Sequence, residues 1–566
     1  MKISKILLIV IILLAFILRF YKLGNYPALN ADEAAIGYNA YSILETGKDE
    51  HGNFWPIHFQ SFNDYKPGLY FYLVMPFIKI FGLNGWAVRT PNAFLGVATV
   101  ALIYLLAQEL IKKRKKIKDQ KRADLEINDN PKDMLPILSA FLLAVSPWHI
   151  HFSRGGWEVN TATFFMVLGL LLFLKGLDKN RYLIFSFLSF ASSLYTYHSA
   201  RVVVPLLGLG LVVIYWKIVR NNLKNYFFAG VIMLAILFPL MKDIIKPEIF
   251  SRAAGVGLFA DPGPISRINE QRGEHIDFTL PYPRIIHNKI VNYSLAFFKN
   301  LSDHFHGEFL FLSGDIIQRN RVPETGQMYL FEIVFVLIGL YKIVRSPKSW
   351  KIILWWLLIA PAAAALTFQS PHALRAQNMV IPLTLISAYG LAYIINWIRN
   401  LEGVSSKLNR KIIRFSCFVL LFAFIFWNIS RYLHMYYVHM AKEYPFSSQY
   451  GVKELVNYFK ENGNNYDNVV VTNKYDQPYI LFLFYLKYPP QQFQENHVLT
   501  SRDKYGFSTV GFFDKFVFQD INWDKDRILF PNSLIIGTDD EIPKEANITK
   551  KIYGSNGYLY FEVVSN

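Results

Sequence analysis

The apolar stretch ILLIVIILLAFIL (Ile6–Leu18) decides the fold, and the polar stretch NADEAA (Asn30–Ala35) follows it after a short connection. A helix that crosses a bilayer needs roughly 17–25 mostly apolar residues. Together with its flanks the apolar stretch comes close to this length, so we predict a membrane span over residues 5–20. Asp32 and Glu33 then lie near the bilayer surface, where carboxylates need water, a cation or a reaction.

The lysines before this run would also fit a secretory signal peptide. The run is followed by Arg19-Phe20-Tyr21-Lys22, however, and not by a small-residue cleavage site. We therefore predict that the first span is retained.

The composition indicates a membrane protein with many spans. Of 566 residues, 53% are hydrophobic and only 18% are charged, and the mean hydropathy is +0.22. A soluble enzyme carries more charge, and here the apolar residues gather in long runs. The only cysteine, Cys417, lies inside one of these runs, so no intrachain disulfide can form.

Eleven segments are predicted to span the membrane as α-helices. They are residues 5–20, 91–110, 135–148, 159–175, 181–196, 201–217, 226–241, 328–342, 351–367, 378–397 and 413–432. If the N-terminus is cytoplasmic, every predicted inner loop is basic, as the positive-inside rule requires. These inner loops are residues 111–134, 176–180, 218–225, 343–350 and 398–412.

The net charge of +17 does not indicate a nucleic-acid partner. Residues 111–134 hold nine Lys/Arg against five Asp/Glu, whereas the tail 434–566 holds thirteen against sixteen. The basic excess therefore belongs to the loops that set orientation, and not to a DNA-binding face.

We predict a transmembrane domain over residues 1–433, with long outer loops at 21–90 and 242–327, and an extracytoplasmic α/β domain over 434–566. The second loop is too long for a simple connection, so we expect it to cover a site. The stretch Pro67–Pro76 is apolar but short, which is typical of a re-entrant or surface-lying helix.

The tail shows the pattern of a small soluble domain. Val452–Glu461 has helical spacing, which Gly463-Asn464-Asn465 interrupts. Asn468–Thr472 and Ser533–Gly537 are strand candidates.

Asp32 and Glu33 allow two interpretations. Asn30 or Asp32 can cap a helix over residues 33–45, and acidic residues stabilise a first helical turn. Alternatively, the pair supplies a general base that removes a proton from a hydroxyl group.

The other outer segments carry further ionisable residues on the same predicted side. These are Asp64 and Lys66, Arg154 and Glu158, Arg201, Asp315 and Arg319, and His372 and Arg375. Lysine and especially arginine can bind phosphate oxygens. Each group also has a structural interpretation; Arg154 and Glu158, for example, are four residues apart and can pair on one helix face.

The centres of the spans are nearly free of charge, which disfavours a transporter or flippase of lipid-linked sugars, although that class explains the spans equally well. A sensor whose tail binds envelope polymer is a third alternative. Histidines occur two apart at His149 and His151, and at His304 and His306, but in no recognised metal-ligand pattern. We predict no metal ligands and no required cofactor, and leave a divalent metal open.

These motifs, in this order, resemble the C-type membrane glycosyltransferases of the protein O-mannosyltransferase and aminoarabinose transferase group. The residues that carry the resemblance are Asp32-Glu33, Lys66-Pro67-Gly68-Leu69-Tyr70, Arg89–Gly96, and Ser153-Arg154 with Glu158. The resemblance covers residues 1–210 well and the later spans loosely. Where the aminoarabinose enzymes have Glu directly before Lys-Pro-Pro, this chain has Asp64-Tyr65-Lys66-Pro67-Gly68.

The resemblance implies transfer of a sugar from a polyprenyl-phosphate donor to a protein, lipid or glycan acceptor, with inversion, on the outer face of the cytoplasmic membrane. It implies that Asp32 is the catalytic base, with Glu33 beside it. Lys66, Arg201 and Arg375, with His372, are the residues to which it assigns the donor phosphate. Asp64, Arg154, Glu158, Asp315 and Arg319 are further site candidates.

Overall fold

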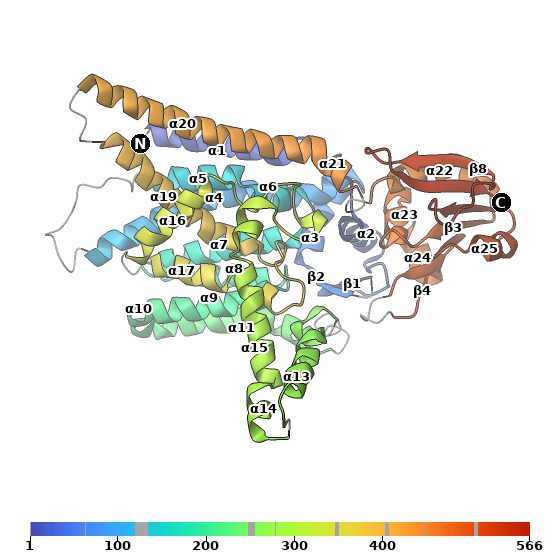
Figure 1. Cartoon of the computed structure of the whole chain (residues 1–566), viewed down its shortest axis with the longest axis horizontal. Coiled ribbons are helices and arrows are strands. Elements are labelled where there is room, and N and C mark those ends of the chain that lie inside the picture. The colour runs from blue at the N-terminus through green and yellow to red at the C-terminus, as the bar shows by residue number, and fades with distance from the viewer. Residues whose placement is uncertain are drawn as a thin grey trace.

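The computed structural model is a long bundle of helices with a mixed sheet domain at one end (Figure 1). It describes residues 2–62, 64–118, 134–246, 255–277, 279–345, 350–401, 407–445, 447, 449–502 and 508–566. Parts of the predicted inner loops 111–134, 343–350 and 398–412 and of the outer loop 242–327, as well as Asn63, lie outside the described residues.

Each of the eleven predicted segments overlaps a helix of the bundle. The helices are α1 (Lys2–Phe20), α4 (Gly85–Lys118), α5 (Leu135–Val145), α6 (Pro147–Arg154), α7 (Glu158–Gly176), α8 (Arg181–Leu194), α9 (Ala200–Ile214), α10 (Trp216–Asn221), α11 (Leu223–Ile244), α16 (Glu332–Val344), α17 (Lys351–Ile359), α18 (Ala362–Ala365), α19 (Val380–Arg399) and α20 (Lys407–His434).

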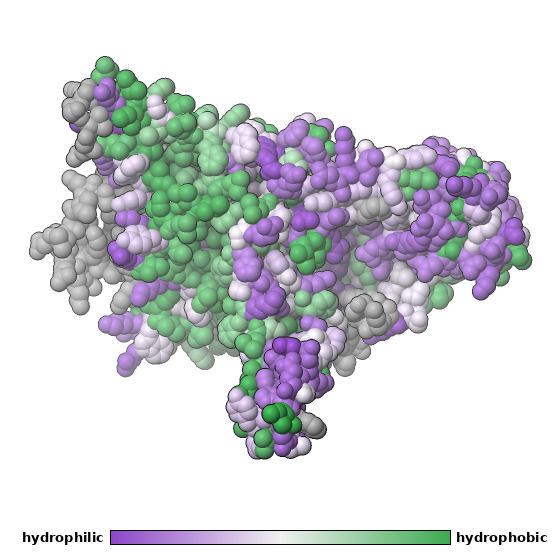
Figure 2. Space-filling view, viewed as in Figure 1, coloured by the Kyte–Doolittle hydropathy of each residue, from purple (hydrophilic) through white to green (hydrophobic). Residues whose placement is uncertain are grey.

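The described residues include five helices long and apolar enough to cross a membrane, or six if the bent pair α5 and α6 counts as one. Figure 2 shows the apolar surface over the bundle and the polar surface over the sheet domain. The polytopic helical class is thus confirmed, whereas the number eleven and the orientation stay predictions.

The bend of 55° between α5 and α6 has a local cause. Pro147 has no backbone N–H and cannot continue the preceding helix. Ser146 therefore caps a new helix, and its hydroxyl accepts a hydrogen bond from the backbone N–H of His149. The break turns the end of α6, which carries Arg154, toward the end of α1.

The outer loop 21–90 is folded. It contains α2 (Ala31–Thr46), the antiparallel strands β1 (His58–Ser61) and β2 (Asp64–Pro67), and α3 (Leu69–Phe81). The predicted helices over 33–45 and 67–76 are confirmed as α2 and α3, and the cap of α2 is Asn30. Gly68 joins β2 to α3 in a tight approach, because a Cβ there would lie 2.7 Å from the carbonyl oxygen of Ile57.

The outer loop 242–327 forms an arm that projects sideways from the bundle (Figure 1). Its elements are η1 (Leu258–Ala260), α13 (Gly263–Gly273), α14 (Pro281–Ile286), α15 (Lys289–Asp303), η2 (Glu308–Leu312) and η3 (Gln318–Asn320). After η2 the chain returns to the bundle, and η3 brings Arg319 to the start of α2, beside Asp32.

The tail folds around a seven-stranded sheet of order β4-β5-β6-β3-β7-β9-β8. Its elements are α22 (Val452–Asn462), β3 (Asn468–Thr472), α23 (Pro478–Leu486), α24 (Pro490–Asn496), β4 (Val498–Leu499), β5 (Val510–Phe513), β6 (Phe516–Gln519), α25 (Trp523–Leu529), β7 (Ser533–Gly537), β8 (Ile548–Tyr553) and β9 (Leu559–Ser565). The central strand β3 is parallel to both neighbours, β6 and β7. The predicted helix and both predicted strands are confirmed as α22, β3 and β7.

The outer loop 21–90 and the tail share one hydrophobic core. Helices α23 and α24 pack on α2, between it and the sheet (Figure 1). The approach is close, since a Cβ on Gly37 would lie 2.6 Å from the ring of Phe484. Tyr38 of α2 also donates its hydroxyl hydrogen to the carbonyl oxygen of Tyr488. This core fixes the position of the tail over the start of α2.

Candidate active site

A cavity of about 350 Å³ lies where the ends of the helices meet the tail. Seven of the eleven predicted site residues line it: Asp32, Asp64, Lys66, Glu158, Arg319, His372 and Arg375. They come from α2, β2, α7, η3 and the loop before η5 (Gln377–Met379). A larger hollow of about 740 Å³ lies between the start of α4 and the tail, and none of the predicted residues lines it.

Asp32 sits in the first turn of α2, which the Asn30 cap holds in place. Its Oδ1 lies 2.6 Å from Nζ of Lys66, and its Oδ2 lies 3.4 Å from a guanidinium nitrogen of Arg319. A quarter of the side chain is exposed. The carboxylate is therefore both oriented by cations and accessible from the cavity.

Lys66 is almost completely buried on β2. Burial alone would lower its pKa, but the negative charges of Asp32, Glu158 and Asp64 outweigh burial and raise the pKa above its usual value. Lys66 is thus a permanent cation in the wall of the cavity, surrounded by carboxylates.

Arg375 and His372 lie in the turn before η5 and face the cavity beside Arg319. Arg375 donates a hydrogen bond to Oγ1 of Thr367 at 2.8 Å. His304 holds the turn from below, because its Nε2 accepts the backbone N–H of His372 while its Nδ1 donates to the carbonyl of Asn300. Burial lowers the pKa of His304 to about 4, which agrees with this neutral form.

Asp315 does not line the cavity but fixes two of its walls. It is completely buried, and burial raises its pKa. Its carboxylate accepts the backbone N–H groups of Ile317 and Ala373 and the side-chain amide of Asn320. It thereby joins the loop that carries Arg319 to the turn that carries Arg375.

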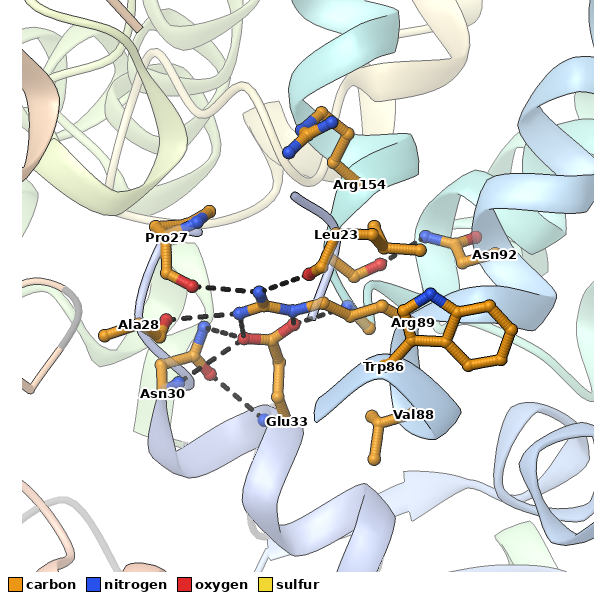
Figure 3. Close-up of polar contacts among 12 residues, drawn as sticks. Leu23, Pro27, Ala28, Asn30, Glu33, Trp86, Val88, Arg89, Asn92 and Arg154 are labelled. Carbon is orange, nitrogen blue, oxygen red and sulfur yellow. Dashed lines mark hydrogen bonds and ion pairs between the residues drawn. The ribbon is translucent and has the colours of Figure 1, made fainter. Parts of the chain in front are cut away.

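Glu33 does not line the cavity. Its carboxylate lies in a buried clamp with Arg89 (Figure 3). Both of its oxygens pair with Arg89 at 2.6 Å, and the backbone N–H of Gly156 donates to Oε1. Arg89 also donates to the carbonyls of Leu23, Pro27 and Ala28. The clamp ties the start of α2 to α4, so Glu33 acts as a structural support for Asp32.

Two predicted arginines also make structural contacts outside the cavity lining. Arg154 is completely buried and donates to the carbonyls that end α1, among them those of Leu18 and Tyr21. Arg201 donates toward His58 on β1 and His198, and His58 in turn pairs with Asp243 at the end of α11. Arg201 thus binds the outer loop 21–90 to α9 and α11.

The chain is similar to known proteins in part of its sequence and in its fold. A family model described as dolichyl-phosphate-mannose-protein mannosyltransferase matches residues 9–116. The structure of ArnT from Cupriavidus metallidurans bound to undecaprenyl phosphate has a TM-score of 0.55 at 11% identity, covering 98% of this chain and 97% of that chain. The predicted resemblance to the C-type membrane glycosyltransferases is confirmed. The family model covers the first fifth of the chain, and the likeness to ArnT is one of fold.

Two further proteins are similar to this chain, one in structure and one in part of its sequence. ArnT from the same organism in the apo state has a TM-score of 0.54 at 10% identity, with coverages of 98% and 97%. A protein of Aquifex aeolicus (strain VF5), described as uncharacterized, is 28% identical over 236 residues. That match spans 41% of this chain and 42% of the relative, less than half the length of either.

The tail supplies cavity residues that were not predicted from the sequence. Asp476 and Gln477 line the cavity together with Asp32 and Lys66. The available signal was the polar stretch Asn473–Gln477 directly after the buried strand β3, because ligand sites often form at the carboxyl ends of parallel strands. Trp157, Tyr197 and His198 are further lining residues that were not predicted.

Within the described ranges, no group of three or more His, Cys, Asp or Glu side chains has the arrangement of a metal site. The cavity does hold several carboxylates, and among them Asp32 forms ion pairs with Lys66 and Arg319. That no metal is required stays a prediction.

Proposed function

We propose that the chain transfers a sugar from a polyprenyl-phosphate donor to an acceptor hydroxyl at the outer face of the membrane. The observation that carries this proposal is the carboxylate of Asp32, which is a quarter exposed in a cavity whose walls carry Lys66, Arg319 and Arg375. A base and a set of cations are the two things that such a transfer needs.

In the proposed reaction Asp32 takes the proton of the acceptor hydroxyl. The acceptor oxygen then forms a bond to the anomeric carbon, and the bond from that carbon to the phosphate oxygen breaks on the opposite face, which inverts the configuration. The electron pair stays on the lipid phosphate. Because a phosphate is a good leaving group once its charge is neutralised, no second carboxylic acid is needed, unlike in glycoside hydrolysis.

The cations of the cavity have two roles in this proposal. Lys66 holds Asp32 at 2.6 Å and orients it. Arg319, Arg375 and His372 bind the phosphate, since the contact of Arg319 with Asp32 is long, at 3.4 Å, and is easily exchanged for a phosphate oxygen. The acceptor, whether protein, lipid or glycan, reaches Asp32 from the exposed side of the cavity.

The direct test is turnover of a labelled donor. Purified full-length protein is incubated with dolichyl or undecaprenyl phosphate carrying radiolabelled mannose or glucose, and release of the polyprenyl phosphate is followed. Release that depends on the protein supports the proposal. A protein that binds these donors but never releases the lipid phosphate contradicts it.

Arg375→Ala is expected to weaken donor binding about tenfold or more, because a hydrogen bond to a charged group contributes roughly 1.5–3 kcal/mol. Binding of dolichyl phosphate to the purified variant measures this. Arg267→Ala is the matched control, because Arg267 lies on the projecting arm and half of its side chain is exposed. Wild-type affinity in Arg375→Ala would mean that the phosphate binds elsewhere.

The orientation predicts which positions a membrane-impermeant thiol reagent reaches in intact cells. In a Cys417→Ser background, Asp540→Cys on the exposed surface of the tail should be labelled from outside. Lys217→Cys, exposed on α10 next to the predicted inner loop 218–225, should be labelled only after the cells are opened. The reverse pattern would place the cavity in the cytoplasm.

A further inference from the structure

The tail reaches the cavity through the loop Asn473–Gln477, between strand β3 and helix α23. This loop leaves the carboxyl end of the central strand, whose two neighbours are parallel to it. Crevices at the carboxyl ends of parallel strands are common ligand sites. Here the crevice faces the membrane bundle, and Asp476 and Gln477 become part of the wall opposite the bundle.

Several contacts hold this loop in one position. Gln449 accepts the backbone N–H of Ala31 at the start of α2 and donates to the carbonyl oxygen of Asp476. Tyr475 donates its hydroxyl hydrogen to the carbonyl of Tyr560, and Asn473 donates to that of Phe518. The loop is thus fastened both to the sheet and to the helix that carries Asp32.

The backbone of Gln477 is unusual. Its φ is +52° and its ψ is 52°, a left-handed conformation that residues other than glycine rarely adopt. Such conformations persist only where the surroundings impose them, and they are frequent at ligand sites. Pro478 follows and begins α23, so the strained residue is the one that turns the chain away from the cavity.

Two polar residues of the loop, Asp476 and Gln477, line the cavity. The side chain of Asp476 is exposed. Its carboxylate interacts with the charges of Asp32, Arg319 and Lys66. The pKa of Asp476 is raised, first because the surrounding protein removes water from the carboxylate, and second because the negative charge of Asp32 lies nearby. Oε1 of Gln477 has no hydrogen-bond partner among the described residues.

A carboxylate in this position cannot serve the donor phosphate, because like charges repel. The phosphate fits the wall of Arg319, Arg375 and His372, and Asp476 faces them from the tail. A carboxylate and an amide oxygen can both accept hydrogen bonds from hydroxyl groups. The donor carries such groups next to its phosphate.

We propose that Asp476 and Gln477 bind hydroxyl groups of the sugar that the donor carries, so that the tail completes the active cavity and selects the sugar. This inference rests on the proposed function. It assigns the tail a part in substrate recognition: the bundle binds the phosphate, and the tail binds the sugar.

The test compares two probes on the full-length protein: dolichyl phosphate, and dolichyl phosphate carrying the sugar (mannose or glucose) that the wild type turns over. Asp476→Ala should weaken binding of the sugar-bearing lipid about tenfold and leave binding of dolichyl phosphate within about twofold. Asp476→Asn should lose less than Asp476→Ala, because the amide still accepts a hydrogen bond. Gln477→Ala should also affect only the sugar-bearing lipid.

Asp524→Ala is the matched control, because this aspartate is 87% exposed on the same domain and does not line the cavity. Equal loss of both probes, or loss of neither, overturns the inference. A raised KM for the acceptor with unchanged donor binding also overturns it, because the hydroxyl groups would then belong to the acceptor. If the wild type itself binds neither lipid, the proposed function has failed.

Discussion

Asp32→Asn should leave donor binding near normal and lower turnover by roughly 10²-fold or more. The amide has the size of the carboxylate and still accepts a hydrogen bond from Lys66, so the cavity keeps its shape. It cannot take the proton of the acceptor hydroxyl, however. Release of labelled polyprenyl phosphate measures the loss of turnover, and binding of dolichyl phosphate measures the site that remains.

Two controls accompany this variant. Asp524→Asn makes the same chemical change at a side chain that is 87% exposed on the tail, and should be as active as the wild type. Asp64→Asn changes another carboxylate of the cavity wall and tests whether the effect is particular to Asp32. Full turnover in Asp32→Asn would exclude Asp32 as the base.

Glu33→Gln should reduce the stability of the protein by about 3–5 kcal/mol, because it leaves Arg89 as an uncompensated buried charge. Both side chains are only 1% exposed, so water cannot replace the lost partner. A strongly lowered thermal midpoint of the detergent-solubilised protein measures this. We expect turnover per folded molecule to fall far less than in Asp32→Asn, because Glu33 does not line the cavity.

The exposed pair Glu324 and Arg431 offers a matched control. Its ion pair is also short, at 2.8 Å, but Glu324 is 70% exposed. Exposed pairs contribute about 0–1 kcal/mol, so Glu324→Gln should change stability very little. If Glu33→Gln folds like the wild type and has lost turnover, Glu33 takes part in the reaction, and its structural assignment is wrong.

The elements of the fold could be predicted because their signals are local. Each of the eleven predicted apolar runs overlaps a helix of the bundle. Asn30 with Glu33 three residues later is a capping box, and α2 begins there. Asn468–Thr472 and Ser533–Gly537 are short β-branched runs, and they became the buried strands β3 and β7.

The functions of the buried arginines could not be predicted, because their partners are distant in the chain. Arg154 donates to backbone carbonyls more than 125 residues away. Every residue has such a carbonyl, so the sequence does not indicate which ones will accept these bonds. Arg201 meets His58 across 143 residues. Both are charged side chains at the outer end of a helix, a pattern that fits a phosphate ligand and a packing clamp equally well.

The composition of the cavity was predictable only in part. Residues such as Asp32, Lys66 and Arg375 were recognisable because they lie outside the apolar runs on one predicted side. Asp476 lies in a tail whose sequence pattern is that of a separate soluble domain, and no nearby residue in the sequence indicates that it lies close to Asp32. That connection depends on the core that α2 shares with α23, which appears only once the chain is folded.

This shared core limits how the protein can change in evolution. The face of α2 that meets the tail carries Gly37 and Tyr38, shaped to fit Phe484 and the carbonyl of Tyr488. A lineage that lost residues 434–566 by deletion would be left with an uncovered apolar helix over its reaction centre. We therefore expect relatives without such a tail to carry polar or larger residues at the positions of Gly37 and Tyr38, so that the two regions are inherited or replaced as a pair.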